Sequence, residues 1–313
     1  MIKPKALKEG DNVAIIAPSS AIKKENIKIV EKSVKSLNLN PVLLPSCSMR
    51  EGHLAGPDSQ RAKDVNDAFK DNSIDGIFCI RGGYGTPRII NKIDYEVVKN
   101  NPKIFLGYSD ITGLHLAFNS ICRMTTLHGP MPSSDSPYYE TDEYTLNSLK
   151  RALFTNKPLG KYTPPEGEEL EVVNSGKCQG EIVGGNLSLL TAALGTKYEI
   201  NTKGKILFIE EVGELNYIID RMLMSLDLNN KFKDCAGILL GTWNKCKPDE
   251  GYEDKIDSPL SKIFDDILGK YDIPILNNFR AGHISPQFTI PFGTSVSIDT
   301  DKKEVVFLES SNI

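Results

Sequence analysis

The sequence has no hydrophobic run long enough to cross a membrane. None of its apolar stretches approaches the ~20 residues that a membrane-spanning helix needs. Its start, MIKPKALKEGDNVAIIAPSS, has one short apolar run at 13–17 after mixed charge, without the long hydrophobic segment and small-residue cleavage site of a signal peptide. These absences predict a cytoplasmic protein with no membrane partner.

An excess of charge of either sign is also lacking. The chain has 37 Lys and Arg against 41 Asp and Glu, a net charge of -4, whereas a nucleic-acid-binding surface is usually basic. With 40% hydrophobic and 25% charged residues, the composition is that of an ordinary folded protein. We therefore expect no nucleic-acid partner.

Cysteine and histidine occur in no metal-binding arrangement. The six cysteines are scattered without a C-x-x-C pair, which is typical of reduced thiols in a cytoplasm. The sequence also lacks an H-E-x-x-H motif and any cluster of Cys and His at the spacing of a zinc site. It predicts neither a metal nor a cofactor.

The length of 313 residues predicts about two domains. In the first half, short apolar runs alternate with helical patterns, which indicates an α/β domain with a mostly parallel sheet and flanking helices. The expected strands are 13–18, 41–45, 76–80, 103–107 and 124–128. The expected helices are 23–37, 58–71, 86–93, 110–119 and 142–153.

A change of texture near residue 155 predicts a domain boundary. Residues 156–178 are rich in Pro, Gly and charge, so we assign them as a linker between an N-terminal domain, 1–155, and a C-terminal domain, 179–313. The second domain is expected to be a smaller α+β unit. Its predicted elements are strands in 205–214 and 236–243, a helix with an apolar face from Ile218 to Leu226, a helix at 257–269, and paired strands in FTIPFG, TSVSID and EVVFLE.

Ser109 stands between an apolar strand and a helix in LGYSDITGLHLAF, residues 106–118. A residue at such a turn projects from the carboxyl edge of a parallel sheet, where α/β proteins bind ligands, and the helix start offers N–H groups to an oxyanion. A serine here can equally be a helix N-cap. Ile111 also replaces the second glycine of the familiar G-x-S-x-G elbow, so the local pattern leaves both roles open.

A serine nucleophile needs a histidine base, and the chain has only four histidines. His115 is six residues beyond Ser109 and is expected to be partly buried and structural. His53 and His128 are plausible loop or strand-end residues. His283 lies in a constrained loop between a glycine and a proline-bounded strand, in the second domain.

The orienting carboxylate is sought in ILFIEEVGE. Glu210 and Glu211 end an apolar strand, and adjacent strand residues point to opposite faces, so only one of them can face a site. A further glycine-rich turn, IRGGYGTPRII at 80–90, can present backbone N–H groups to an oxyanion, although it lacks the lysine and hydroxyl pair of a phosphate-binding loop.

Taken together, these segments resemble the LD-carboxypeptidase family, serine peptidases that include muramoyltetrapeptide carboxypeptidases and microcin C immunity peptidases. The resemblance runs from about residue 11 to 306 in the order of the family. The motifs that carry it are DNVAIIAPSS, IRGGYGTPRII, LGYSDITGLHLAF, GGNLSLLTAALGT, ILFIEEVGE, GILLGTW and GHISPQFTIPFG.

The resemblance implies a catalytic triad of Ser109, Glu210 and His283 in a site between the two domains. The oxyanion hole would combine the N–H of Asp110 with that of Gly82 or Gly83. Candidate substrate-pocket residues are Tyr84, Trp243 and Arg81. The resemblance also implies a homodimer.

The activity implied is hydrolysis of the L,D-amide bond before the terminal D-alanine of a muropeptide tetrapeptide, through an acyl-enzyme, in peptidoglycan recycling. One alternative is cleavage of a peptidyl or aminoacyl nucleotide, as in the microcin C immunity peptidases. Those enzymes carry an aromatic platform, for which the single tryptophan, Trp243, gives no clear signal. A second alternative is a non-catalytic protein that binds a small molecule or peptide.

Overall fold

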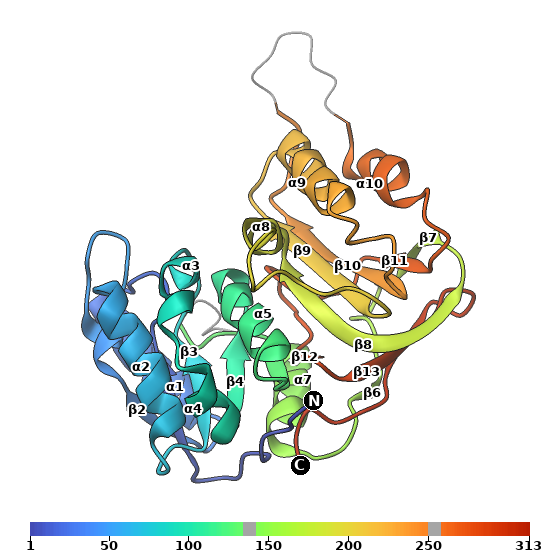
Figure 1. Ribbon diagram of the computed structural model, residues 1–313. Coiled ribbons are helices and arrows are strands. Elements are labelled where there is room, and N and C mark those ends of the chain that lie inside the picture. Colours follow the sequence, from blue (N-terminus) through green and yellow to red (C-terminus); the bar gives the residue numbers. More distant parts are fainter. Residues whose placement is uncertain (134–141, 250–257) are drawn as a thin grey trace. The chain divides into compact units, whose positions relative to one another are not determined.

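The computed structural model describes residues 1–133, 142–249 and 258–313 of an α/β fold (Figure 1). The chain forms two compact units. The first unit comprises Met1–Leu159, Ser285–Thr294 and Glu309–Ile313, and the second comprises Gly160–Ile284 and Ser295–Leu308. Within the described residues, no helix has the length and apolar character that crossing a membrane requires.

The first unit is built on a six-stranded sheet with the order β12-β5-β4-β3-β1-β2. The strands β1 to β5 run parallel, and only β12 is antiparallel to its neighbour. All five strands predicted for the first half are present. The six strands are β1 (Asn12–Ile16), β2 (Asn40–Leu43), β3 (Gly76–Cys79), β4 (Ile104–Gly107), β5 (Thr126–His128) and β12 (Ile290–Phe292).

Helices connect and cover these strands. The five predicted helices are present, three of them with a 3-10 turn at one end, and α4 is an additional helix that begins where the Asp94 carboxylate accepts the Val97 N–H. The α-helices are α1 (Ile27–Lys35), α2 (Asp58–Lys70), α3 (Thr86–Ile89), α4 (Tyr95–Asn100), α5 (Thr112–Ser120) and α7 (Glu143–Phe154). The 3-10 turns are η1 (Lys24–Asn26), η2 (Pro45–Ser48), η3 (Ile90–Lys92) and η4 (Ser109–Ile111).

The central strands of this sheet are buried on both faces. Every residue of β3 and β4 is buried, which explains why these strands are continuous apolar runs rather than alternating ones. Phe105 of β4 packs edge-on against Phe118 of α5, with ring centroids 4.9 Å apart, and Phe69 of α2 packs on the same ring at 5.4 Å. This core provides a rigid base for the loops at the carboxyl ends of the strands.

The second unit contains an eight-stranded mixed sheet with the order β6-β14-β13-β8-β9-β10-β11-β7. Four consecutive strands, β8 to β11, run parallel to one another, and the other strands pair antiparallel with their neighbours. The strands are β6 (Gly160–Lys161), β7 (Glu171–Asn174), β8 (Lys177–Asn186), β9 (Ile206–Val212), β10 (Gly237–Asn244), β11 (Ile275–Asn277), β13 (Ser295–Asp299) and β14 (Glu304–Phe307).

Among the residues of the second unit that the structure describes, three helices accompany the sheet: α8 (Leu187–Ala192), α9 (Asn216–Leu228) and α10 (Leu260–Leu268). The apolar face predicted for α9 is buried at Ile219, Leu223 and Leu226. The helix predicted at 257–269 corresponds to α10, although residue 257 lies outside the described residues.

The chain is divided between the units differently from the sequence-based assignment. Residues 156–178, assigned as a linker, contribute β6 and β7, which pair with β14 and β11. FTIPFG does not pair with TSVSID but forms β12, which adds to the first sheet beside β5, whereas TSVSID and EVVFLE pair as β13 and β14. The first sheet leaves an edge at β5 open to an apolar strand, and the sequence pattern of that strand does not encode which edge it joins.

Candidate active site

Ser109 occupies a strained turn at the carboxyl end of β4. Its φ of 66° lies in the left-handed region, which costs a residue other than glycine about 1–3 kcal/mol. The preceding Tyr108 is extended, and the N-cap positions of η4 and α5 are Tyr108 and Ile111, so Ser109 is not at a helix N-cap. Backbone strain of this type is found most often at active sites, and here it occurs at the carboxyl edge of the sheet.

The glycine-rich turn after β3 lies directly against Ser109. A Cβ atom on Gly82 would stand 2.8 Å from the Ser109 Cβ, 3.0 Å from its Oγ and 3.3 Å from the Asp110 nitrogen. Gly83 has a φ of 107° and packs in the same manner against Ser20. Only glycine therefore fits at these two positions, and the turn approaches the serine and the next peptide nitrogen closely.

The orientation of the Gly82–Gly83 peptide follows from one hydrogen bond. The Ser20 N–H donates to the Gly82 carbonyl oxygen at 3.3 Å. Because the C=O and N–H of a planar trans peptide point in opposite directions, the Gly83 N–H points away from Ser20. The glycine-rich turn is thus bonded to the loop after β1 through the Gly82 carbonyl oxygen, and the Gly83 N–H takes no part in that contact.

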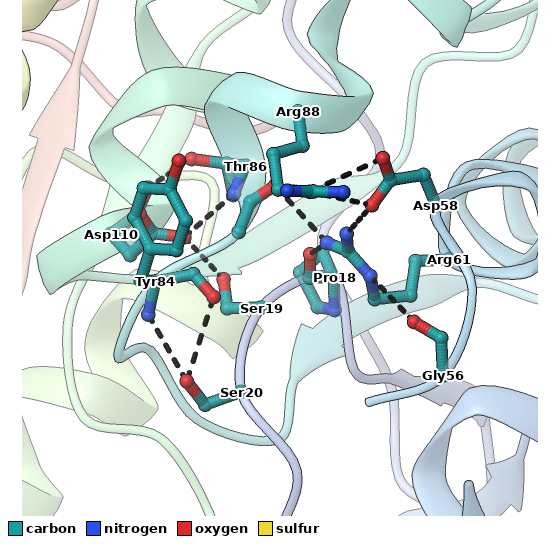
Figure 2. A network of polar contacts seen from close by, with 11 residues as sticks. Pro18, Ser19, Ser20, Gly56, Asp58, Arg61, Tyr84, Thr86, Arg88 and Asp110 are labelled. Atoms are coloured by element: carbon teal, nitrogen blue, oxygen red, sulfur yellow. Dashed lines mark hydrogen bonds and ion pairs between the residues drawn. The ribbon is translucent and has the colours of Figure 1, made fainter. Parts of the chain in front are cut away.

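The Asp110 carboxylate joins three loops at this edge of the sheet (Figure 2). Its Oδ2 accepts the Ser19 hydroxyl at 2.6 Å and the Thr86 N–H at 2.8 Å. The Thr86 hydroxyl in turn donates to the Asp110 carbonyl oxygen at 2.6 Å. Burial raises the pKa of the Asp110 carboxyl, and the hydrogen bonds from Ser19 and Thr86 oppose that rise.

Arg61 of α2 holds the same loops from the other side (Figure 2). Its side chain is fully buried and donates to the carbonyl oxygens of Pro18, Gly85 and Gly56. Its charge is compensated by Asp58. A buried guanidinium with several acceptors is costly to disturb, so the loops after β1 and β3 are rigidly connected.

In the second unit, Glu210 and His283 form a hydrogen-bonded pair. Glu210 lies in β9 with a fully buried side chain, and its Oε2 is 2.7 Å from the His283 Nδ1. Gly282 permits this approach, because a Cβ there would lie 2.6 Å from the Glu210 Oε2. The carboxylate accepts a hydrogen bond from a proton held on Nδ1. In a neutral imidazole this tautomer leaves Nε2 as the hydrogen-bond acceptor.

Glu211 points to the opposite face of β9, as the alternation of strand residues predicts. Its carboxylate accepts the Asn186 amide at 2.8 Å, the Ser188 N–H at 2.9 Å and the Ser188 hydroxyl at 2.7 Å. Burial raises the pKa of the Glu211 carboxyl. These contacts anchor the start of α8, whereas Glu210 alone contacts the histidine.

The other histidines have surroundings of a different kind. His115 is fully buried, rather than partly buried as predicted, and its Nε2 lies 2.8 Å from the Gly107 carbonyl oxygen. Burial lowers the pKa of His115 to about 4. His128 is buried in β5 and packs against Phe292, with ring centroids 5.3 Å apart. His53 packs against Tyr84 at 5.8 Å.

The buried His115 predicts a loss of stability in acid. Its pKa is about 4 in the folded chain and about 6.5 when exposed, so the unfolded chain binds more protons between these values. We expect the free energy of unfolding to fall by about 2–3 kcal/mol from this residue between pH 7 and pH 4.5. Urea unfolding of the wild type and His115→Gln at both pH values measures it, and an equal pH dependence in the two proteins would contradict it.

The three candidate pocket residues lie in different units. In the first, Tyr84 is 49% exposed and its N–H donates to the Ser20 hydroxyl at 3.1 Å, while Arg81 donates to the Ala21 carbonyl oxygen at 3.3 Å. Trp243 lies on β10 of the second unit, where its ring packs against Phe264 at 5.0 Å.

The structure groups the predicted site residues into two sets. Ser109, Asp110, Gly82 and Gly83 lie together in the first unit, and Glu210 contacts His283 in the second. Sequence reasoning missed Ser19, Thr86 and Arg61. The sequence gives a weak indication of Ser19 and Thr86, because each follows a buried strand and lies in one of the motifs shared with the LD-carboxypeptidase family. Arg61 carries none, because a charged residue in a polar helix is normally exposed.

Comparisons with known proteins cover nearly the whole chain. The family model of the LD-carboxypeptidase N-terminal domain matches residues 13–129, and that of the LD-carboxypeptidase C-terminal domain matches residues 179–298. A probable murein peptide carboxypeptidase of Bacillus subtilis is 38% identical over 304 residues, 97% of this chain and 93% of that protein.

Two further proteins are also similar to this chain. The microcin C7 self-immunity protein MccF of Escherichia coli is 30% identical over 288 residues, 82% of this chain and 80% of that protein. The crystal structure of muramoyltetrapeptide carboxypeptidase from Oxalobacter formigenes shares the fold, with a TM-score of 0.81 and 22% identity over 96% of this chain and 99% of that one. The chain therefore belongs to the LD-carboxypeptidase family of peptidases.

Proposed function

We propose that the protein is a serine carboxypeptidase that removes the terminal D-alanine of muropeptide tetrapeptides, with Ser109, Glu210 and His283 as its triad. The observation that carries the proposal is the 2.7 Å contact between the buried Glu210 and His283, which prepares a histidine base. The strained backbone of Ser109 and the similarity to a murein peptide carboxypeptidase support it. The proposal requires the two units to bring His283 to Ser109 in the active enzyme.

The proposed reaction is an acyl transfer through the serine. His283 Nε2 takes the proton of Ser109 as its Oγ attacks the carbonyl carbon of the L,D-amide, and Glu210 stabilises the imidazolium. The C–N bond then breaks, the D-alanine amine leaves with the proton from His283, and an acyl-enzyme remains. Water, deprotonated by His283, hydrolyses that ester and restores Ser109.

The oxyanion of each tetrahedral intermediate needs two N–H donors. We assign them to Asp110, which follows the nucleophile, and to the glycine-rich turn. Of the two glycines in that turn, Gly83 is favoured, because its N–H points away from Ser20 while the neighbouring Gly82 carbonyl is held by that residue. Gly82 contributes by allowing the turn to approach Ser109.

The substrate pocket is proposed to include Arg81, Tyr84 and Trp243. Arg81 supplies a cation for a substrate carboxylate, and the half-exposed ring of Tyr84 supplies apolar surface beside the turn. The protein is proposed to act as a homodimer in the cytoplasm, where peptidoglycan fragments are recycled.

Cleavage of an aminoacyl or peptidyl nucleotide is the second candidate. The 30% identity to MccF favours it. Trp243, the only tryptophan, packs against Phe264, and this contact constrains its use as a stacking platform for a base.

Stereochemistry tests the proposed substrate directly. A pocket for a terminal D-residue misplaces the methyl or the carboxylate of the L-epimer, and a misplacement of about 1 Å costs roughly 10²-fold in rate. We expect a tetrapeptide ending in D-Ala to be cleaved roughly 100 times more efficiently than its L-Ala epimer, measured as the ratio of kcat/KM values.

The same assay separates the alternatives. Equal rates on the two epimers would contradict the LD-carboxypeptidase activity. Faster hydrolysis of an aminoacyl sulfamoyl nucleotide than of either tetrapeptide would favour the second candidate. Binding of the tetrapeptide without any hydrolysis would indicate a non-catalytic protein.

A further inference from the structure

We propose that the Asp110 side chain is a positioning group for catalysis, and that Ser19 and Thr86 hold it so that the Asp110 N–H faces the oxyanion. The inference deepens the proposed function and rests on it. It concerns three side chains of the first unit, none of which belongs to the triad.

Asp110 combines a proposed donor and an anchor in one residue. Its N–H follows the nucleophile directly, and its carboxylate accepts hydrogen bonds from Ser19 at 2.6 Å and from the Thr86 nitrogen at 2.8 Å. Its own carbonyl oxygen accepts the Thr86 hydroxyl at 2.6 Å. The side chain of Asp110 and the peptide group after its Cα are therefore both tied to neighbouring loops.

The hydrogen bonds from Ser19 and Thr86 to the Asp110 carboxylate are shielded from water and are made to a charged group. Ser19 and Thr86 are 0% exposed and Asp110 is 1% exposed, so water does not compete for these hydrogen bonds. Hydrogen bonds to a carboxylate are stronger than those between neutral groups. The three contacts can therefore offset the strain of the left-handed Ser109 next to them in the chain.

The neighbours of Thr86 position its hydroxyl for the hydrogen bond to the Asp110 carbonyl oxygen. A Cβ on Gly113, in the first turn of α5, would lie 2.6 Å from the Thr86 Oγ1, so a glycine is what lets the hydroxyl reach Asp110. On the other side, Arg61 donates to the carbonyl oxygen of Gly85, the residue before Thr86, at 3.0 Å. The partner of Asp110 is thus fixed from two directions.

Loss of this anchor is expected to lower kcat and leave KM almost unchanged. An oxyanion donor acts on the charge that develops in the transition state, and its removal typically costs 10²–10³-fold in kcat. A donor that is displaced but not removed loses part of that effect. Binding of the uncharged ground-state carbonyl depends little on it.

The experiment compares Ser19→Ala and Thr86→Val with matched controls. Ser33→Ala and Thr125→Val remove buried hydroxyls that donate to the backbone elsewhere in the first unit. With the D-Ala tetrapeptide we expect kcat to fall about 10–100-fold in the two test variants, with KM within about threefold of wild type, and neither control to lose more than about twofold. Thr86→Ser keeps the hydroxyl and is expected to restore most of kcat.

A fluorophosphonate probe gives a readout that is independent of the peptide. Its reaction with Ser109 also needs the oxyanion donors, so the labelling rate of the test variants is expected to fall in proportion to kcat. If the wild type is labelled but does not cleave the tetrapeptide, the proposed substrate fails while the labelling rates still decide the positioning role.

Two results would overturn the inference. One is a labelling rate and kcat in Ser19→Ala and Thr86→Val that match those of Ser33→Ala and Thr125→Val. The other is a rise in KM with unchanged kcat. Circular dichroism identifies any variant that fails to fold, and Ser19→Ala, which deletes a single oxygen atom, then decides the question.

Discussion

Ser109→Ala is expected to abolish hydrolysis while the protein stays folded. The alanine removes the oxygen that forms the acyl-enzyme, and loss of a triad serine lowers kcat by roughly 10⁴-fold or more. Alanine keeps the Cβ that packs against Gly82, so the turn after β3 retains its contact. The rate of D-alanine release from the tetrapeptide and the thermal unfolding midpoint measure the two parts of this result.

Two companion variants sharpen the test. His283→Ala is expected to fall to a similarly low rate, and the double variant to lose little more, because the members of a triad act as a unit. Ser120→Ala is the control, since Ser120 ends α5, the helix that begins three residues after Ser109, and its hydroxyl donates to the Leu116 carbonyl oxygen. Wild-type turnover in Ser109→Ala would rule out Ser109 as the nucleophile.

The elements of the first sheet could be predicted because their signals are local. Strands such as β3 and β4 are buried on both faces, so each is an unbroken apolar run bounded by Gly or Pro. The position of β12 could not be predicted in this way. Its pairing with β5 joins residues more than 160 positions apart, and an alternating or apolar strand pattern specifies a face but not a partner.

The short strands β6 and β7 were missed for a related reason. β6 has two residues, and β7 consists of half-buried or exposed residues, so neither shows apolar periodicity. Each lies at one end of the strand order of the second sheet, where polar side chains are tolerated. Composition alone therefore gives these residues the appearance of a linker.

Some features of the candidate site follow from the sequence, and others do not. The opposite directions of Glu210 and Glu211 follow from strand geometry, whereas the choice of Glu210 as the partner of His283 came from the resemblance. The hydrogen bonds between Ser19, Thr86 and Asp110 depend on three loops that meet only when the sheet is assembled. A single sequence does not specify such contacts between loops that are far apart along the chain.

Glu210→Gln is expected to lower kcat far more than Glu211→Gln. The Glu210 carboxylate holds the proton on His283 Nδ1, and an amide in its place can donate to Nδ1 and leave the proton on Nε2, the atom that must accept the Ser109 proton. Loss of the correct tautomer and of the negative charge beside the imidazolium lowers kcat by roughly 10²-fold or more. Steady-state kinetics with the D-Ala tetrapeptide measure this loss.

Glu211→Gln is the matched control, because it makes the same chemical change one residue away in the same strand. The Glu211 carboxylate accepts hydrogen bonds from Asn186 and Ser188, so replacing it with an amide is expected to destabilise the start of α8 by about 1–3 kcal/mol. The same change is expected to alter kcat by less than about tenfold. The two variants thus separate a loss of stability from a loss of catalysis. If Glu211→Gln loses the larger share of kcat while Glu210→Gln remains active, the catalytic carboxylate is Glu211, and the 2.7 Å contact between Glu210 and His283 has no part in the reaction.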